Sequence, residues 1–133
     1  HVGIACDTPR GLMVPTLFNA DKLSLSEISV KSKELTSACR EGTINPDLLT
    51  GGTFTVTNLG TLGVESFTPV LNPPQTGILG VCGITERTRN DVPYPAMGLS
   101  LTFDHRAVDG APSARFLQEV VKKLENFSLT LAF

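Results

Sequence analysis

The stretch Gly51-Gly52-Thr53-Phe54-Thr55-Val56-Thr57-Asn58-Leu59-Gly60 decides the fold prediction. Phe54 and Val56 alternate with threonines, the period-two pattern of a strand whose successive side chains point to opposite faces. A second stretch, residues 77–83, is short, apolar and bounded by glycine, which is typical of a strand covered on both faces. The centre of the chain is therefore predicted to be two strands, the second of them buried on both faces.

Segments with helical periodicity lie on both sides of these strands. Ser24 to Glu27 has the spacing of a capping box, and Gly42 is a suitable end for the helix that follows. A second helix is expected after Gly110, with an apolar stripe within residues 116–124. Further extended stretches are expected at residues 2–6, 12–17 and 97–103, a short helical turn beginning at Asn45-Pro46, and a loop at 90–95. This order predicts a mixed α/β (α+β, two-layer) domain, a sheet with helices packed on it.

Composition narrows the function classes. The 133 residues are enough for one domain, spanning 1–133, and 41% hydrophobic content is enough to build a core. The net charge of -2 comes from scattered residues with no basic block, so we expect no nucleic-acid partner. The apolar runs are short, so we expect no membrane span, and no secretory leader is visible. The chain opens in a strand-like stretch without Met, as if the sequence were entered midway.

The three cysteines, Cys6, Cys39 and Cys82, are odd in number and far apart in sequence. They form no disulfide framework and no CxxC pair, so a reducing compartment is expected. Each lies in an apolar stretch, which favours a small buried hydrophobe over a reactive thiol.

The best catalytic candidate is His105, in the string Asp104-His105-Arg106-Ala107-Val108-Asp109-Gly110 between a strand and a helix. Asp109 can return to brace the same turn, and Gly110 is expected to supply a backbone conformation closed to other residues. An imidazole held in this way suits a general base near neutral pH. The alternative, a histidine at a helix end or on the surface without a catalytic role, stays open on spacing alone.

The second candidate is the segment Thr57 to Gly60 at the end of the central strand. The Thr57 hydroxyl could donate to a developing oxyanion, where one donor is typically worth about 3 kcal/mol. Asn58 and Gly60 are equally typical of an ordinary turn. Other chemistries lack their motifs: no glycine stretch has the context of a phosphate loop, no cluster has metal-ligand spacing, and no serine lies in a Gly-x-Ser-x-Gly elbow. No metal is expected.

Together these segments resemble one family, the dihydrolipoamide acyltransferases of 2-oxoacid dehydrogenase complexes. The residues 51–60 resemble its G-G-T-F-T-x-[ST]-N-L-G signature, and residues 104–111 resemble its D-H-R-x-x-D-G-A string. Asn72 to Gln75 with residues 77–81, and the opening residues 3–12, are also similar. The resemblance runs from about residue 1 to residue 131 and implies the chloramphenicol acetyltransferase fold, with the N-terminal part of the catalytic domain missing.

The resemblance implies transfer of an acyl group between dihydrolipoamide, carried on a separate lipoyl domain, and coenzyme A. His105 would be the base, Thr57 the oxyanion donor, and Asp109 a residue that holds the loop and pairs with an arginine. Two departures matter. The family usually has serine at the position of Thr57, and the missing part would carry that arginine, so this polypeptide alone could be inactive.

The resemblance also implies trimers with the active site between subunits, assembled into cubic or dodecahedral cores that bind lipoyl domains and the other components of the complex. The apolar tail, residues 129–133, is expected to dock into a neighbouring trimer. The expected location is bacterial cytoplasm or mitochondrial matrix. Two rivals remain: a non-catalytic core protein of the same complexes, and a coenzyme A-dependent acyltransferase acting on a small antibiotic or another alcohol.

Overall fold

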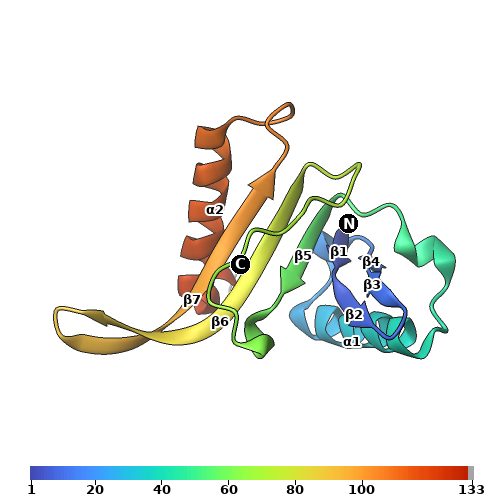
Figure 1. Ribbon diagram of the computed structural model, residues 1–133, viewed down its shortest axis with the longest axis horizontal. Coiled ribbons are helices and arrows are strands. Elements are labelled where there is room, and N and C mark those ends of the chain that lie inside the picture. Colours follow the sequence, from blue (N-terminus) through green and yellow to red (C-terminus); the bar gives the residue numbers. More distant parts are fainter. Residues whose placement is uncertain (132–133) are drawn as a thin grey trace. The chain divides into compact units, whose positions relative to one another are not determined.

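The protein, described here by a computed structural model, is defined over residues 1–131 and divides into two compact units, residues 1–102 and residues 103–133 (Figure 1). The main elements in chain order are β1 (Val2–Ile4), β2 (Cys6–Thr8), β3 (Gly11–Met13), β4 (Thr16–Leu17), η1 (Ala20–Lys22), α1 (Leu25–Glu41), η2 (Pro46–Leu49), β5 (Phe54–Asn58), η3 (Gly60–Leu62), β6 (Gly77–Arg89), β7 (Val92–Phe103), α2 (Gly110–Glu125) and α3 (Phe127–Thr130).

The first unit is built on a five-stranded sheet of order β4-β1-β5-β6-β7. Strand β5 is parallel to both β1 and β6, whereas β4 is antiparallel to β1. Strands β2 and β3 form a separate two-stranded sheet. The mixed sheet with helices confirms the predicted α+β class.

At two glycines the chain packs too closely around β6 to leave room for a side chain. The predicted buried strand at 77–83 is confirmed as the first half of β6, in which five of seven residues are buried. A Cβ on Gly80 would come within 2.5 Å of the Ser100 hydroxyl, and one on Gly60 would lie 2.6 Å from the Cys82 carbonyl oxygen. Glycine is therefore required at both positions, because real side-chain atoms do not approach so closely.

The prediction of a loop at residues 90–95 is wrong. Asn90 and Asp91 form a tight turn, both with positive φ (49° and 62°), and β7 begins at Val92. Asparagine and aspartate tolerate this conformation, which two-residue hairpin turns need. Pro93 and Pro95 suggested a loop, but β7 is an edge strand, where proline is tolerated.

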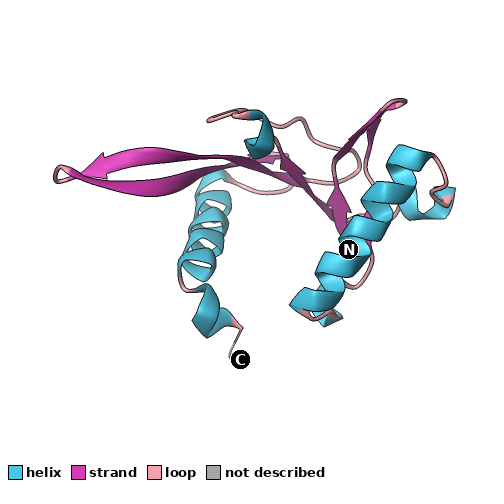
Figure 2. Ribbon diagram, turned by 90° about the horizontal axis from the view of Figure 1, so that it is seen from below, coloured by secondary structure: helices cyan, strands magenta, loops and turns pink. Residues whose placement is uncertain are grey.

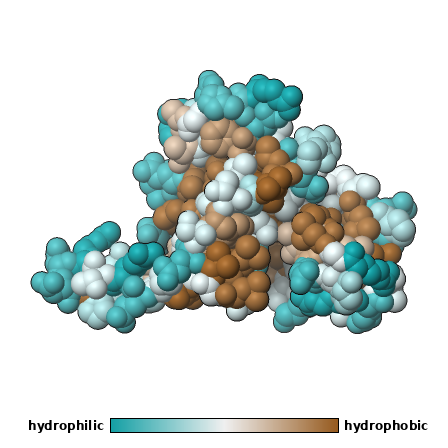
Figure 3. Space-filling view, in the orientation of Figure 1, coloured by the Kyte–Doolittle hydropathy of each residue, from teal (hydrophilic) through white to brown (hydrophobic). Residues whose placement is uncertain are grey.

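The two strands of this hairpin extend as an arm (Figure 2), whose outer end is hydrophilic (Figure 3). Apolar side chains nevertheless remain exposed on the arm: Ile84, Val92, Tyr94 and Met97. The arm is therefore a ribbon with a largely hydrophilic outer end and exposed apolar side chains along its length.

Helix α1 begins and ends as the sequence predicts. The Ser24 side chain accepts from the Glu27 backbone N–H, and the Glu27 carboxylate accepts from the Ser24 N–H at 2.8 Å. Gly42 ends the helix with φ 76°. The helix packs against β2 and β4, with Cys39 buried, while Leu25 at the first turn is half exposed. The short helical turn is confirmed as η2, where the Asn45 side chain accepts from the Asp47 N–H.

The two N-terminal extended stretches are shorter than predicted. The stretch at 2–6 breaks at Ala5, whose N–H donates to the Val56 carbonyl, and the chain then turns into β2. The stretch at 12–17 breaks at Val14-Pro15, so that β4 is only two residues long. Proline has no N–H to donate to a ladder, and β4 lies at the edge of the sheet, where a neighbouring proline is tolerated.

The core contains the cysteines. Cys6, Cys39 and Cys82 are all buried and unpaired, as predicted, and burial raises the pKa of the Cys39 thiol. Within residues 1–131 the other buried apolar residues include Pro15, Leu17 and Ile78. Such a small core leaves much apolar surface uncovered. None of the helices within residues 1–131 has the length and apolarity needed to cross a membrane.

The C-terminal helix has its predicted stripe only in part. Helix α2 begins at Gly110 as expected, and Leu117, Val120 and Val121 are partly buried. Phe116 and Leu124, also predicted to be buried, are about half exposed. In the apolar tail, Leu129 and Leu131 are exposed, and Ala132 and Phe133 lie outside the described residues.

A buried hydrogen bond gives a direct test of the central strand. The Thr55 hydroxyl is fully buried and donates to the Gln75 side-chain oxygen at 2.6 Å. It so ties β5 to the proline-rich loop, the segment before β6 that contains Pro69, Pro73 and Pro74. Thr55→Val keeps the shape but removes the donor, and we expect a loss of about 1–2 kcal/mol in the free energy of unfolding. Urea denaturation measures it, with Thr88→Val on the exposed arm as the matched control. Equal stability of the two variants would contradict the assigned role.

Candidate active site

The turn between β7 and α2 is organised by a single residue, Asp104, through its side chain and its backbone carbonyl. One Asp104 side-chain oxygen accepts from the Arg106 backbone N–H at 2.9 Å. The Asp104 carbonyl accepts from the backbone N–H groups of Ala107 and Val108, at 2.9 and 3.1 Å. All three N–H groups that follow His105 therefore bind Asp104, and the turn is closed around the histidine.

His105 projects from this turn with 71% of its side chain exposed. Its Nδ1 lies 3.7 Å from an Asp109 carboxylate oxygen, and its ring is 5.7 Å from the ring of Phe103. The contact with Asp109 is longer than a hydrogen bond and acts electrostatically. Because Nδ1 faces the carboxylate, Nε2 is the nitrogen left for a ligand.

Asp109 occupies the N-cap position of α2 without capping it through its side chain. Its backbone carbonyl holds the first turn instead, accepting from the N–H of Ser113 at 3.2 Å and from its hydroxyl at 2.9 Å. This arrangement leaves the carboxylate available to His105. The structure thus places the Asp109 carboxylate beside His105 within one turn, and the catalytic roles expected of the two residues stay predictions.

The reason given for Gly110 is wrong. Gly110 is the first residue of α2, its φ lies outside the left-handed region, and a Cβ there would meet no atom within 4 Å. The helical conformation at this position is open to other residues, so no strained backbone is needed here.

Sequence reasoning missed the partner of Asp104. The Arg106 guanidinium donates to both carboxylate oxygens, with Nη2 2.6 Å from one and Nε 3.0 Å from the other. These hydrogen bonds, with the backbone N–H of Arg106, lower the pKa of Asp104 from 3.8 to about 2. The pKa of Arg106 is raised by the same pairing. An Asp-x-Arg string could have indicated this pair, since the two side chains leave the same side of a tight turn.

Thr57 lies one residue before the end of β5, paired with Gly80 of β6. Its side chain is partly exposed, and within residues 1–131 its hydroxyl makes no intramolecular hydrogen bond. The Asn58 side-chain oxygen accepts from the Gly60 N–H at 2.8 Å, which confirms the turn chemistry predicted for these two residues. The structure thus leaves a free hydroxyl beside a well-formed turn.

The predicted site residues fall into two groups. His105 and Asp109 are brought together within the second unit, whereas Thr57, Asn58 and Gly60 belong to the first. Each group is organised within its own unit. Within residues 1–131 no group of three or more His, Cys, Asp or Glu side chains could hold a metal ion.

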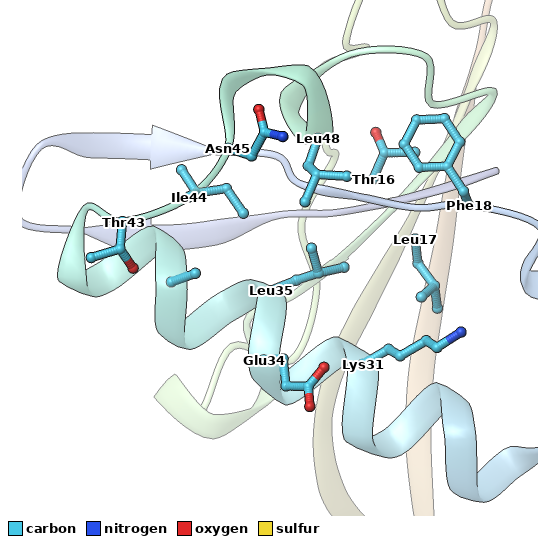
Figure 4. Close-up of a pocket in the computed structure, with 11 residues that line it drawn as sticks. Thr16, Leu17, Phe18, Lys31, Glu34, Leu35, Thr43, Ile44, Asn45 and Leu48 are labelled. Atoms are coloured by element: carbon cyan, nitrogen blue, oxygen red, sulfur yellow. The ribbon is translucent and has the colours of Figure 1, made fainter.

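A groove of about 440 Å³ opens in the first unit between β4, α1 and η2 (Figure 4). Leu17, Leu35 and Leu48 give it an apolar lining, and Lys31 and Glu34 lie on its α1 side. None of the predicted site residues lines it. The groove is therefore separate from the candidate chemistry.

Comparison with known protein families shows which family the chain belongs to. Residues 1–132 match the family described as 2-oxoacid dehydrogenases acyltransferase (catalytic domain). The chain belongs to this family.

Two relatives show how close the likeness is within this acyltransferase family. The chain is 47% identical over 130 residues to the dihydrolipoyllysine-residue acetyltransferase component of the acetoin cleaving system of Bacillus subtilis, covering 94% of the chain and 32% of that protein. It is 42% identical over 131 residues to the dihydrolipoyllysine-residue succinyltransferase component of the 2-oxoglutarate dehydrogenase complex of Buchnera aphidicola, covering 96% and 32%. The chain thus spans about a third of the length of these relatives.

Solved structures of similar proteins support the same family relationship. A dihydrolipoamide acetyltransferase from Azotobacter vinelandii, studied for the role of a serine, a histidine and an asparagine in its catalytic mechanism, superposes with a TM-score of 0.93 at 35% identity. The cubic core of a pyruvate dehydrogenase multienzyme complex gives the same values. In both cases 98% of this chain and 55% of the other are covered. The fold of this acyltransferase family is therefore confirmed for the chain.

The low pKa of Asp104 predicts the pH range in which this carboxyl group stabilises the fold. A carboxyl whose folded pKa is about 2, below its ordinary 3.8, stabilises the fold above pH 3.8 and loses that contribution as the pH falls towards 2. We expect Arg106→Gln to return the titration of Asp104 towards 3.8, as followed by the 13C shift of its carboxyl group. Lys122→Gln, which breaks a similar exposed pair with Glu119, is the control. An unchanged midpoint in Arg106→Gln would contradict the assignment.

Proposed function

We propose that residues 1–133 are the C-terminal portion of one acyltransferase catalytic domain, which moves an acyl group between dihydrolipoamide and coenzyme A. The observation that carries the proposal is the approach of Asp109 to His105 Nδ1, within a chain that belongs to the acyltransferase family. This arrangement leaves Nε2 exposed for a thiol. The lipoyl group is carried by a separate domain, and both thiols act as substrates.

In the forward direction His105 Nε2 takes the proton from the thiol of coenzyme A. The thiolate attacks the thioester carbonyl of acyl-dihydrolipoamide, and the tetrahedral oxyanion accepts a hydrogen bond from the Thr57 hydroxyl. Collapse of this intermediate breaks the bond to the lipoyl sulfur, which takes the proton from the imidazolium. Asp109, facing Nδ1, stabilises the imidazolium formed on the way.

The Azotobacter vinelandii enzyme supports these assignments. The histidine and the asparagine studied there are separated by four positions, as His105 and Asp109 are here. An amide and a carboxylate share an acceptor oxygen but differ in charge. We infer that the contact of Asp109 with the ring serves to orient it as well as to stabilise its charge. We infer that Thr57, which also carries a hydroxyl, takes the place of the serine studied in that enzyme.

The partners follow from the same relationship. We propose that the full protein assembles with copies of itself into a trimer and a larger core, with Thr57 and His105 meeting from neighbouring subunits. Uncovered apolar side chains support this assembly, among them Ile84 on the arm and Phe116 on α2. The cubic core of a similar protein supports it as well. Lipoyl domains and the other components of the complex would then bind this core, in bacterial cytoplasm or mitochondrial matrix.

The two rival functions are less well supported. A non-catalytic core protein has no need of an exposed histidine held against a carboxylate, yet both are present. An acyltransferase for a small alcohol would share His105 and Asp109, but the matched relatives act on dihydrolipoyllysine residues. The relatives include both acetyl- and succinyltransferases, so the acyl group itself is left open.

The base assignment is tested in the full-length protein with His105→Ala. We expect acetyl transfer from acetyl coenzyme A to dihydrolipoamide to fall by at least the ~10²–10⁴-fold that a general base contributes, with the assembly intact by light scattering. The matched control is His1→Ala, at the other histidine of the chain, which should keep its activity. Activity of His105→Ala within about tenfold of wild type would end the assignment.

The oxyanion donor is tested with two substitutions at Thr57. Thr57→Ala removes the hydroxyl and should lower kcat by about two orders of magnitude, the usual loss for one donor. Thr57→Ser keeps the hydroxyl and should retain most of the wild-type rate. Steady-state kinetics in both directions measure the effect, and equal rates for the two variants would contradict the role.

A further inference from the structure

The turn that carries His105 depends on a residue that touches no substrate in the proposed mechanism. Three successive backbone N–H groups, those of Arg106, Ala107 and Val108, all bind acceptors on Asp104. His105 lies in the chain between Asp104, which accepts these hydrogen bonds, and Arg106, the first residue that donates one. The path of the backbone at His105 is therefore set by Asp104.

The imidazole has little else to hold it. Its side chain is 71% exposed, and its contacts in the second unit are the Phe103 ring at 5.7 Å and the Asp109 carboxylate at 3.7 Å. A side chain without close packing is oriented mainly by its backbone, and a displacement of about 1 Å at a reacting group can cost about a hundredfold in rate. Distortion of the turn would therefore move the ring directly.

The ion pair between Asp104 and Arg106 also affects the charges close to His105. The Arg106 guanidinium binds both oxygens of Asp104, so the carboxylate next to His105 in sequence is already neutralised. Asp109 is the unpaired carboxylate that faces the ring. The next charged side chain on α2 is Arg115, in the second turn of the helix. The charge near His105 in this unit is thus one ion pair plus one carboxylate.

We propose that Asp104 and Arg106 are positioning residues for His105: the Asp104 carboxylate binds the first N–H of the turn, the Arg106 guanidinium holds that carboxylate by both oxygens, and Asp109 is left as the single carboxylate acting on the ring. This inference rests on the proposed function, in which His105 is the base. The pair is exposed on the arginine side, where Arg106 is 91% accessible, so its strength depends on salt.

Three variants of the full-length protein separate this role from a purely structural one. Arg106→Gln leaves an unpaired negative charge on Asp104, the residue before His105, which favours the imidazolium, so the acid limb of the pH–rate profile moves to higher pH. Asp104→Asn keeps an acceptor for the Arg106 N–H but leaves a free positive charge, so the limb moves to lower pH. The double variant removes both charges and returns the limb towards its wild-type position.

The size of each effect follows from exposure and geometry. We expect each limb to move by a few tenths of a pH unit, because water screens exposed charges. In both single variants kcat should fall by about tenfold to a hundredfold, because the side chain that binds the first N–H of the turn is no longer held by the guanidinium and the ring is less well placed, while KM for coenzyme A changes by less than about threefold. Lys122→Gln, which breaks the 2.6 Å pair with Glu119 on α2, is the matched control and should alter neither quantity.

A second measurement does not depend on turnover. The rate at which diethylpyrocarbonate modifies His105, followed by mass spectrometry against pH, should shift in opposite directions in the two single variants. If both profiles stay at the wild-type position and only thermal stability falls, the pair is structural and the proposal is overturned. If a single variant does not assemble, Arg106→Lys, which keeps the charge, should assemble and show a smaller loss of kcat; full wild-type kcat in that variant would also overturn the proposal.

Failure of this inference can be told from failure of the proposed function. Should His105→Ala keep its transferase activity, the base assignment is lost, yet the modification profile of His105 still reports whether the pair acts on the ring. Should His105→Ala be inactive while the three pair variants match wild type in both profiles and in kcat, only the inference about Asp104 and Arg106 is lost.

Discussion

The close parallel packing of β5 against β6 is the constraint on which the rest of the first unit depends. A Cβ on Gly77 of β6 would come within 2.7 Å of the Phe54 ring of β5. Glycines also allow the close approach of β6 to its other neighbours, since Gly80 lies against Ser100 of β7 and Gly60 of η3 lies against the carbonyl of Cys82. Parallel strands cannot be joined by a short turn, and the connection between these two runs through η3 and the proline-rich loop. The hydrogen bond from Thr55 to Gln75 fastens that loop to β5. The same strand then delivers the Thr57 hydroxyl at its end, beside the turn made by Asn58.

The second unit solves a different problem, which is to hold an exposed ring in place without a core around it. Hydrogen bonds to one aspartate replace packing: Asp104 accepts from the three N–H groups that follow His105. The ring then meets a carboxylate from the start of α2, because the Asp109 side chain does not cap its own helix. A strand end, a closed turn and a helix start thus supply the base and its charged neighbour from a segment of six residues, 104–109. The account of function depends on this local geometry and on membership of the acyltransferase family.

Local signals in the sequence predicted local structure well. The capping box at Ser24 and the glycine at the end of α1 act through neighbouring backbone groups and need no tertiary information. The arm was missed because prolines argue against a strand unless it lies at an edge, and edge position is a property of the whole sheet. Gly110 was misjudged because a glycine beside a turn can equally begin a helix. The pairing of Asp104 with Arg106 depends on a turn conformation that spacing alone does not specify.

The most direct test of the central claim is a crystal structure of the full-length protein with coenzyme A bound. The account predicts the thiol sulfur within hydrogen-bonding reach of His105 Nε2, roughly 3–4 Å away, with Nδ1 still facing Asp109. A thiol held beyond about 6 Å from the ring, or approaching from the Nδ1 side, would contradict the assignment of His105 as the base.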